Sequence, residues 1–238
     1  LEKEGNLFLG QSRNTIYIWK TGGIAQVGDM DRLNQINWQG KNVSPGDLYP
    51  LDVSGPDGVP DGKIDDEYDR VVVGSPDPKF YGGFSTDLSY KGLSLNLVFN
   101  YSYGAKKLSP LYETLVGSTG SSLASVDLLD RWTPENTGAK FPRPMYQDGN
   151  DTAPSYNPFS ASQMDFSVQK ASYLRLSTLT LAYTLPGKIV NSLKLDNLRV
   201  YGTASNVFCL TPYKGYDPET GDWYPPTRMF VFGLNVSF

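Results

Sequence analysis

Histidine is absent from this sequence of 238 residues, and cysteine occurs once, at Cys209. Without histidine the chain lacks the commonest general base and the commonest transition-metal ligand, which excludes Ser-His-Asp and Cys-His catalysis. A single cysteine excludes a disulfide framework within the chain and leaves the redox compartment undecided. We therefore do not expect an enzyme, and we expect Cys209 to be a small buried or lipid-facing residue.

Long apolar runs and basic runs are missing as well. No stretch of about 18 apolar residues occurs, so a helical membrane protein is excluded. Lysine and arginine number 21 against 25 aspartates and glutamates, and the net charge of -4 makes nucleic acid an unexpected partner. Residues 1–10 lack the pattern of a signal peptide, so the true N-terminus of an exported protein would lie upstream.

What the sequence does contain is strict period-2 alternation in segments of about ten residues, the length of a membrane-spanning strand. From 93 to 103 the odd positions are apolar or aromatic and the even positions are almost all polar. Residues 80–90 alternate in the same way, and Lys91-Gly92 predicts a tight hairpin turn between the two strands. Leu95, Leu97, Phe99 and Tyr101 should form one exposed apolar band, with Asn96 and Asn100 on the opposite face.

Three further strands are expected at 173–185, 197–207 and 230–238. The phase of the first changes near Ser177, which predicts a bulge or the point where the strand leaves the membrane. Long connections at about 21–78, 104–171 and 208–227 alternate with short ones at 91–92 and 186–195, the loop asymmetry of an outer-membrane barrel. The prolines of 104–171 exclude central sheet there, and a short helix is expected at Ser122–Trp132, capped by Ser121 or Ser122.

Two fold classes explain this alternation. A soluble β-sandwich also has half-buried alternating strands. The aromatic-rich apolar faces, drawn from 16 Tyr, 11 Phe and 4 Trp, and the terminal strand that ends at Phe238 favour a transmembrane antiparallel β-barrel, an all-β fold.

A series of short motifs resembles the SusC-like TonB-dependent outer-membrane importers of Bacteroidetes. Any one motif is weak, but their common order over residues 46–238 makes chance an implausible explanation. They read Gly46-Asp47-Leu48-Tyr49, Asp61-Gly62-Lys63-Ile64-Asp65, Asp69-Arg70-Val71, Gly74-Ser75-Pro76-Asp77-Pro78, Arg131-Trp132-Thr133-Pro134-Glu135-Asn136, Ser172-Tyr173-Leu174-Arg175-Leu176, Leu181-Ala182-Tyr183-Thr184-Leu185-Pro186, Gly215-Tyr216-Asp217-Pro218-Glu219, Tyr224-Pro225 and the terminal Phe238.

The resemblance implies that residues 1–238 are the C-terminal strands of a plugged barrel of roughly 22 strands. It also implies import of an oligosaccharide or peptide with a SusD-like surface lipoprotein, in the outer membrane of a Gram-negative bacterium of the Bacteroidetes. Energy would come from the TonB-ExbB-ExbD complex through a plug and TonB box outside this chain. Phe238 resembles the terminal signal that the barrel assembly machinery reads.

The alternative function is a soluble or surface carbohydrate-binding sandwich, which could depend on calcium, and a passive porin is a third. Calcium is considered because residues 57–69 resemble an acidic calcium loop, with Asp57, Asp61, Asp65 and Asp69 as candidate ligands. The spacing is imperfect, since Val59 stands where such a loop has an oxygen acceptor and Tyr68 where it has a bidentate glutamate. A solvated acidic turn is therefore the favoured interpretation, and no other cofactor is expected.

Loop aromatics beside carboxylates form the candidate surface for a sugar or peptide, because such ligands are held by flat apolar faces and a few oriented polar groups. For each residue alone, loop packing or an interfacial girdle is the stronger reading. Arg175, on an expected strand, should face either the lumen or an ion pair. The candidate substrate residues are Trp38, Trp132, Tyr146, Tyr213, Tyr216, Asp217, Glu219, Trp223 and Tyr224.

Overall fold

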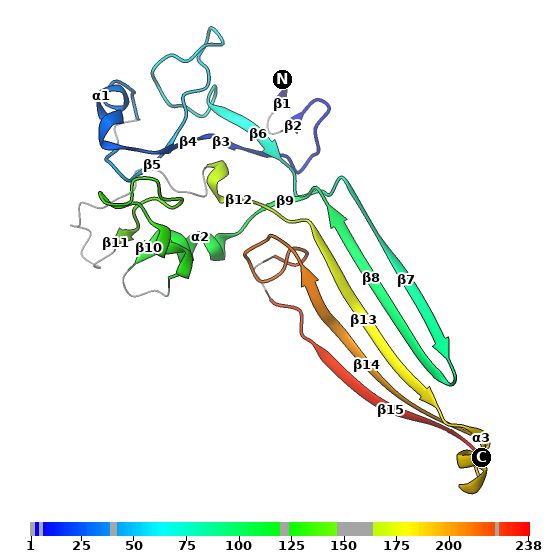
Figure 1. The fold of residues 1–238 in the computed structure, drawn as a ribbon. Coiled ribbons are helices and arrows are strands. Elements are labelled where there is room, and N and C mark those ends of the chain that lie inside the picture. The colour runs from blue at the N-terminus through cyan, green and yellow to red at the C-terminus, as the bar shows by residue number, and fades with distance from the viewer. Residues whose placement is uncertain (1–2, 5–6, 39–41, 120–123, 147–163, 222–223) are drawn as a thin grey trace. The chain divides into compact units, whose positions relative to one another are not determined.

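The structure, a computed structural model, describes residues 3–4, 7–38, 42–119, 124–146, 164–221 and 224–238. The chain divides into two compact units, which are described separately. Unit 1 holds residues Leu1–Pro76 and Lys106–Gln169, and unit 2 holds Asp77–Ala105 and Lys170–Phe238 (Figure 1). The expected long connections at 21–78 and 104–171 are thus mostly part of a unit with a core of its own.

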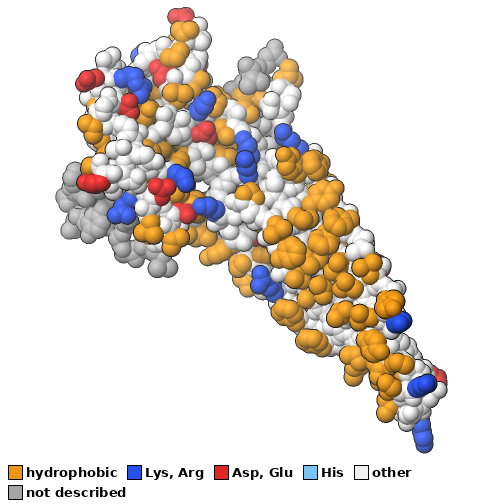
Figure 2. Space-filling model, in the orientation of Figure 1, with side chains coloured by type: hydrophobic (Ala, Val, Ile, Leu, Met, Phe, Trp, Pro, Cys, Tyr) orange, Lys and Arg blue, Asp and Glu red, His pale blue; other side chains and the backbone are white. Residues whose placement is uncertain are grey.

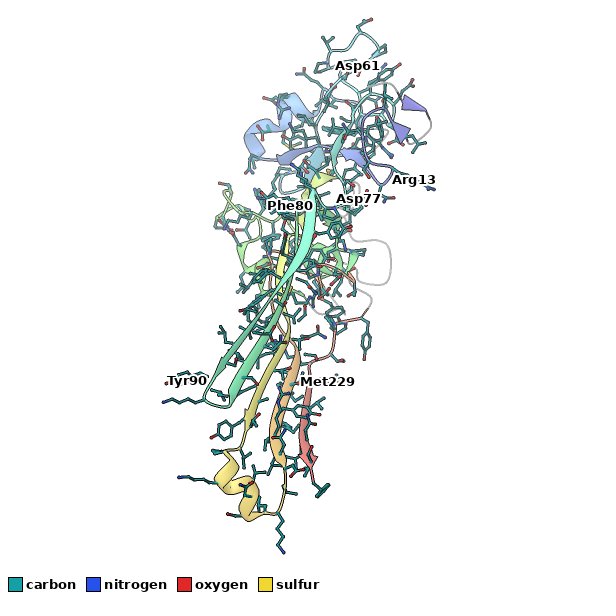
Figure 3. All side chains as sticks on the ribbon, turned by 90° about the vertical axis from the view of Figure 1, so that its right-hand side faces the viewer. Arg13, Asp61, Asp77, Phe80, Tyr90 and Met229 are labelled. Carbon is teal, nitrogen blue, oxygen red and sulfur yellow. The ribbon has the colours of Figure 1, made fainter. Side chains whose placement is uncertain are left out.

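Unit 2 is built around one five-stranded antiparallel sheet, in the order β15-β14-β13-β8-β7 (Figure 1). Each strand coincides with a segment of alternating residues, because a sheet with one apolar face needs an apolar side chain at every second position. The strands are β7 (Phe80–Tyr90), β8 (Leu93–Tyr103), β13 (Tyr173–Thr184), β14 (Asn197–Leu210) and β15 (Met229–Ser237). Figure 3 labels Phe80 and Tyr90 at the two ends of β7.

The hairpin between β7 and β8 is confirmed. Lys91 and Gly92 both have positive φ, at 46° and 86°. Two such residues make the type I′ turn, whose twist matches that of the strands it joins. A side chain at position 92 would also meet the carbonyl oxygen of Thr184, 2.7 Å from the added Cβ, which explains why glycine stands there.

The bulge expected near Ser177 is also confirmed. The register of β13 shifts between Leu176 and Thr178 against both β8 and β14. Leu176 pairs with Phe99 and Leu179 with Leu97, so the extra residue returns Leu176 to the face that carries Leu179. The apolar face of the sheet is therefore continuous, although the alternation in the sequence changes phase at the bulge.

The strand register places the connections at two ends of the sheet. Tyr173 pairs with Ser102, and Leu174 with Leu210, so the chain leaves toward 104–171 and 208–227 at one end. The hairpin at 91–92 and a short helix, α3 (Gly187–Ser192), lie at the other end, as the alternation of strands predicted (Figure 1). The sequence did not predict α3, which begins after Pro186.

Unit 1 consists of short paired strands and short helices. β3 (Ile16–Trp19) pairs with β6 (Arg70–Gly74), and β4 (Thr21–Ile24) with β5 (Leu48–Pro50). The remaining elements are β1 (Lys3–Glu4), β2 (Leu7–Phe8), η1 (Val27–Asp29), α1 (Met30–Leu33), β9 (Lys106–Leu108), α2 (Pro110–Gly117), β10 (Ser118–Thr119), η2 (Val126–Asp130), β11 (Met145–Tyr146), η4 (Asp165–Ser167) and β12 (Val168–Lys170).

The core of unit 1 collects apolar residues from segments far apart in the sequence. Its buried members are Trp19, Ala25, Leu33, Trp38, Val43, Leu48, Tyr49, Ile64 and Met164. The two buried indoles find polar partners for their N–H groups, Trp19 on the carbonyl of Asp65 and Trp38 on the carbonyl of Leu33. Satisfied indoles can be buried at no loss of hydrogen bonding, so both act as core residues.

The helices of 104–171 differ from the prediction. Where a helix was expected at Ser122–Trp132, the structure has the shorter 3₁₀ helix η2, and its cap is the hydroxyl of Ser125, which accepts from the N–H of Asp127. Ser121 and Ser122 lie outside the described residues. The helix α2 was not predicted, although Pro110 at its first position follows the usual preference. No helix in the described ranges has the length and apolar character needed to cross a membrane.

Candidate functional site

The sheet of unit 2 has one face that is almost wholly apolar. Residues directly opposite each other in an antiparallel pair point to the same side, so the register defines this face. Figure 2 shows apolar side chains gathered over these strands. The face carries Phe80, Phe84, Leu88, Tyr90, Leu93, Leu95, Leu97, Phe99, Tyr101, Tyr103, Leu174, Leu176, Leu179, Leu181, Tyr183, Leu198, Val200, Ala204, Phe208, Leu210, Phe230, Phe232, Leu234 and Val236.

The outer strands of this face are exposed, and its centre is half-buried. Phe232 is 83% exposed. Leu95, Leu97, Phe99 and Tyr101 are half-buried, because β8 lies inside the sheet, between β7 and β13, and neighbouring rings cover it. The predicted band is therefore on the expected face, but the prediction that these four residues are exposed was wrong in degree.

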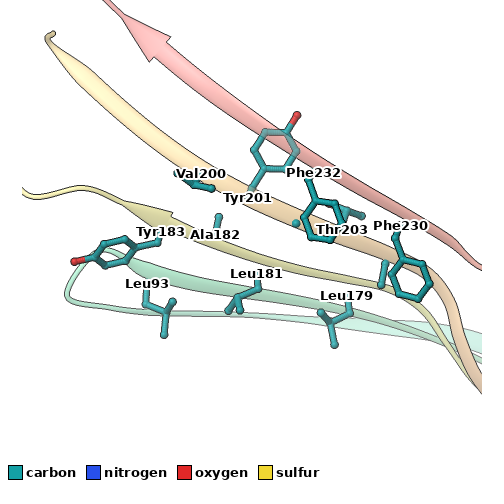
Figure 4. A pocket seen from close by; sticks show the side chains of 12 residues that line it. Leu93, Leu179, Leu181, Ala182, Tyr183, Val200, Tyr201, Thr203, Phe230 and Phe232 are labelled. Atoms are coloured by element: carbon teal, nitrogen blue, oxygen red, sulfur yellow. The ribbon is translucent and has the colours of Figure 1, made fainter. Parts of the chain in front are cut away.

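Aromatic side chains and glycines shape the apolar surface. Phe84 stacks on Phe99 with 4.8 Å between ring centroids, and Phe80 stacks on Tyr103 at 5.0 Å. A Cβ at Gly202 would lie 3.2 Å from the ring of Phe232, so the glycine leaves room for the ring across the strands. An open groove of about 400 Å³ runs over this face, lined among others by Leu93, Leu179, Leu181, Val200, Phe230 and Phe232 (Figure 4).

The opposite face is polar and carries side chains that bind each other. Asn96 donates to Asp87 at 2.8 Å, Asn100 donates to Ser177 at 2.9 Å, and the hydroxyls of Thr180 and Thr203 are 3.0 Å apart. Asn96 and Asn100 thus lie on the face opposite the leucines, as predicted. In a soluble protein the apolar face of a sheet is buried and the polar face is exposed. In unit 2 the apolar face has exposed outer strands.

An ion pair lies at the end of this polar face from which the long connections leave. Arg175 Nη2 is 2.6 Å from Asp217 Oδ2 and 3.6 Å from Glu219 Oε2. Arg175 and Asp217 are buried, whereas Glu219 is exposed. The guanidinium also lies 5.3 Å from the centroid of the Tyr173 ring. Of the two roles considered for Arg175 from the sequence, the structure shows the ion pair.

Asp217 organises the turn that follows it. Its Oδ1 accepts from the backbone N–H groups of Glu219 and Thr220, and its carbonyl accepts from the N–H of Gly221. Burial alone would raise the pKa of Asp217, but the N–H of Thr220, the hydrogen bond from Arg175 and the N–H of Glu219 together hold this pKa below its usual range.

This pKa predicts how the turn responds to acid. The pKa of Asp217 is lower in the folded state than in the unfolded chain. Its contribution to stability is therefore complete above the ordinary carboxyl pKa of about 3.9 and is lost as the pH falls through the lower pKa of the folded state. Amide hydrogen exchange should therefore show loss of protection at Glu219 and Thr220 below about pH 4. Unchanged protection down to full carboxyl protonation would contradict this role.

Unit 1 contains a second buried ion pair, near Trp132. Arg143 binds Asp47 through two contacts, Nε to Oδ1 at 2.6 Å and Nη2 to Oδ2 at 3.1 Å. Asp47 also accepts from the N–H of Ser44 at 2.9 Å. Trp132 is buried beside Gly46, whose φ of +89° and missing Cβ admit the indole, and its N–H donates to Gln26 at 2.9 Å. These contacts join three segments of unit 1.

Of the candidate substrate aromatics whose side chains are described, three are buried and two are exposed. Trp38, Trp132 and Tyr213 are buried, so they have packing roles where the sequence placed them in ligand-facing loops. Tyr216 and Tyr224 are exposed on the segment between β14 and β15 and stay candidates for ligand contact. Trp223 and the side chain of Tyr146 lie outside the described residues.

Carboxylates of the acidic segment 57–69 accept hydrogen bonds from backbone N–H groups. Asp69 is fully buried and accepts from the N–H groups of Val53, Ser54 and Asp65. Asp65 accepts from Glu67 and Tyr68, and Asp61 from Lys63. Within the described ranges no group of three or more Asp, Glu or Cys side chains is placed to hold a metal ion. Calcium binding by Asp57, Asp61, Asp65 and Asp69 stays a prediction, while the turn interpretation accounts for the contacts seen.

The known proteins that this chain is similar to are TonB-dependent receptors and a peptide transporter. TonB-dependent receptor P3 of Formosa agariphila is 29% identical to this chain over 96% of its length, and TonB-dependent receptor SusC of Bacteroides thetaiotaomicron is 34% identical over 31%. A solved structure of the RagAB peptide transporter matches 94% of the chain with a TM-score of 0.68 and 25% identity. The chain spans only 22% of receptor P3 and 22% of the RagAB chain. No family model matches.

Proposed function

Because this chain is homologous to SusC-like TonB-dependent receptors, we propose that it forms part of the wall of an outer-membrane nutrient importer. The observation that carries this proposal is the five-stranded sheet with one apolar face, whose outer strands are exposed. In a bilayer the apolar face meets lipid, and the hydrogen-bonded polar face lines the lumen. The strands, at 9 to 14 residues, suit a tilted membrane crossing.

The two edges of the sheet support the proposal that it closes into a barrel. Among the described residues, β7 and β15 each pair with a neighbour on one side only. An unpaired strand edge in hydrocarbon costs several kcal/mol for each unsatisfied backbone group. We propose that strands from the rest of the longer protein pair with both edges, in a plugged barrel of roughly 22 strands.

The peptide and the TonB dependence in this proposal come from the names of the relatives, and the other partners and the oligosaccharide come from the resemblance of the sequence motifs. RagAB is described as a peptide transporter, and SusC and receptor P3 as TonB-dependent receptors. The importer proposed here takes up an oligosaccharide or peptide together with a SusD-like lipoprotein. The TonB-ExbB-ExbD complex supplies the energy, and the barrel assembly machinery inserts the protein into the outer membrane of a Gram-negative bacterium of the Bacteroidetes. This chain performs no covalent chemistry in that process.

Fractionation and uptake test the two halves of the proposal. The full-length protein should stay with the outer membrane through washes with salt and chelator and leave it only with detergent, because a lipid-facing band holds it. Release by salt or chelator would instead support a surface carbohydrate-binding module. A knockout should lose uptake of labelled oligosaccharides or peptides, and loss of TonB should have the same effect. Uptake that persists without TonB would contradict energy-coupled import.

The sandwich alternative finds no support in unit 2. A sandwich needs a second sheet against the apolar face. The described residues of unit 2 form one sheet, and Phe230, Phe232 and Leu234 on its apolar face stay exposed. We therefore prefer the proposal that this sheet is part of a barrel wall to the sandwich alternative.

A further inference from the structure

The two faces of the sheet differ in burial at the end where the long connections leave. On the polar face, Ser102 is 9% exposed and Arg175 6%. On the apolar face at the same end, Tyr103 is 54% exposed and Leu210 61%. Polar side chains are usually the exposed ones. Ser102 and Arg175 are therefore covered locally, because Tyr81 on the same face is 77% exposed and Leu176 on the apolar face is 5% exposed.

The segment that contacts Arg175 is 211–221, which follows β14 directly. It is attached near its start, where the hydroxyl of Thr211 donates to the carbonyl of Ser172 at 2.9 Å and the ring of Tyr213 is buried with Ala105 and Ala171. It is attached again at Asp217, which with Pro218 is buried. The second attachment is the ion pair of Asp217 with Arg175 on β13.

The attachment at Arg175 depends on few contacts. Nη2 carries both carboxylate contacts, at 2.6 Å to Asp217 and 3.6 Å to Glu219. The Nε of Arg175 is buried with no hydrogen-bond partner among the described residues. Removing Asp217 therefore leaves a buried guanidinium whose remaining partners are the exposed Glu219 at 3.6 Å and the Tyr173 ring, an unfavourable arrangement that displacement of the segment would relieve.

We infer that residues 211–221 fold inward over the polar face of the wall, held by the Arg175–Asp217 pair, and narrow the mouth of the channel on its lumen side. This inference rests on the proposed function, since it takes the polar face as the lumen. Arg175 and Asp217 are then positioning residues. They hold a segment that brings the exposed side chains of Tyr216 and Glu219 to the entrance used by the imported ligand.

Cys209 is a built-in reporter for this arrangement. It is the register partner of Arg175 on β14, so its side chain points to the same polar face, and it is half-buried. Because Arg175, its partner across the strands, is held by segment 211–221, displacement of the segment should expose Cys209 further to a hydrophilic maleimide from the lumen side. A faster reaction of Cys209 would then report that displacement.

The experiment uses the full-length protein purified in detergent, and the measured quantity is the rate of Cys209 modification by a hydrophilic maleimide. Asp217→Ala should raise this rate at least about tenfold, because opening of the segment controls access. Glu219→Ala is the matched control and should change it less than about twofold, since an exposed charge contributes little. Cys209→Ser should remove the signal, and heat-modifiable mobility should show that each variant is folded. If Asp217→Ala does not fold, Asp217→Asn keeps the shape of the side chain and replaces it.

The outcomes separate this inference from the proposed function. Equal rates in the native protein and the folded Asp217 variant would overturn the inward-folded segment, with the wall arrangement intact. Reaction of Cys209 with a lipid-soluble maleimide alone would place the polar face against lipid and overturn the proposed function as well. Slow labelling that Asp217→Ala accelerates and Glu219→Ala does not supports both.

Discussion

Leu97→Arg should greatly reduce the yield of folded protein in the outer membrane. Leu97 lies at the middle of β8, on the apolar face between Thr86 of β7 and Leu179 of β13. If that face meets lipid, an arginine near the bilayer midplane costs about 2 to 4 kcal/mol. The measurement is the fraction of heat-modifiable, protease-resistant protein in outer-membrane preparations of the full-length protein.

Asn96→Arg is the control for this prediction. Asn96 precedes Leu97 on the same strand but lies on the polar face, where it donates to Asp87. An arginine there can face water and stay near that carboxylate, so the yield should change little. If Leu97→Arg and Asn96→Arg reduced the yield of folded protein equally, the idea that one face meets lipid and the other water would be wrong.

The strands of unit 2 could be predicted from sequence because a single physical demand sets them. A sheet with one apolar face requires alternation, and the alternation of residues 93–103 shows in the sequence without knowledge of any partner strand. The bulge at Ser177 could be found for the same reason, since one extra residue inverts the phase. What the pattern leaves open is how far each residue is covered by its neighbours, so Leu97 was predicted to be more exposed than it is.

The buried ion pairs could not be predicted in this way. Arg175 and Asp217 are 42 residues apart, and Asp47 and Arg143 are 96 apart. No local periodicity connects such partners, and their pairing depends on the packing of whole segments. The burial of the aromatics in the proline-rich stretches could not be predicted for the same reason. Trp38 and Trp132 have no alternating context that could separate a core indole from an exposed one.

The motifs that carried the family resemblance have structural roles in this chain. Gly46 and Asp47 belong to the Trp132 and Arg143 contacts, Asp69 accepts three backbone N–H groups, and Asp217 binds Arg175. They fix the packing of the connecting segments. The resemblance therefore indicated how the loops are built more than which residues touch a ligand.

Asp47→Ala should open unit 1 around Trp132. Asp47 is fully buried, and both of its carboxylate oxygens bind Arg143, whose side chain is 29% exposed. Its backbone N–H and carbonyl bind Ser44 and Ala25, so the residue lies where three segments meet. Removing one partner of a buried pair costs about 3 to 5 kcal/mol, and we expect the lower end, about 3 kcal/mol, because water can reach part of Arg143. Hydrogen exchange of the full-length protein should show lost protection at the amides of Trp132 and Arg143, and limited proteolysis should cut nearby.

Asp66→Ala provides the matched comparison for Asp47→Ala. Asp66 pairs with Arg70 at 2.8 Å, but the two side chains are 65% and 34% exposed. Such a pair contributes at most about 0.5 kcal/mol, so its loss should leave exchange and proteolysis unchanged. Asp47→Asn separates charge from shape, because it keeps an acceptor for the N–H of Ser44 while removing the charge that binds Arg143, and it should fall between the other two variants. If Asp47→Ala and Asp66→Ala behaved alike, the Arg143 pair would not hold the three segments together, and the burial of Trp132 would have to rest on apolar packing alone.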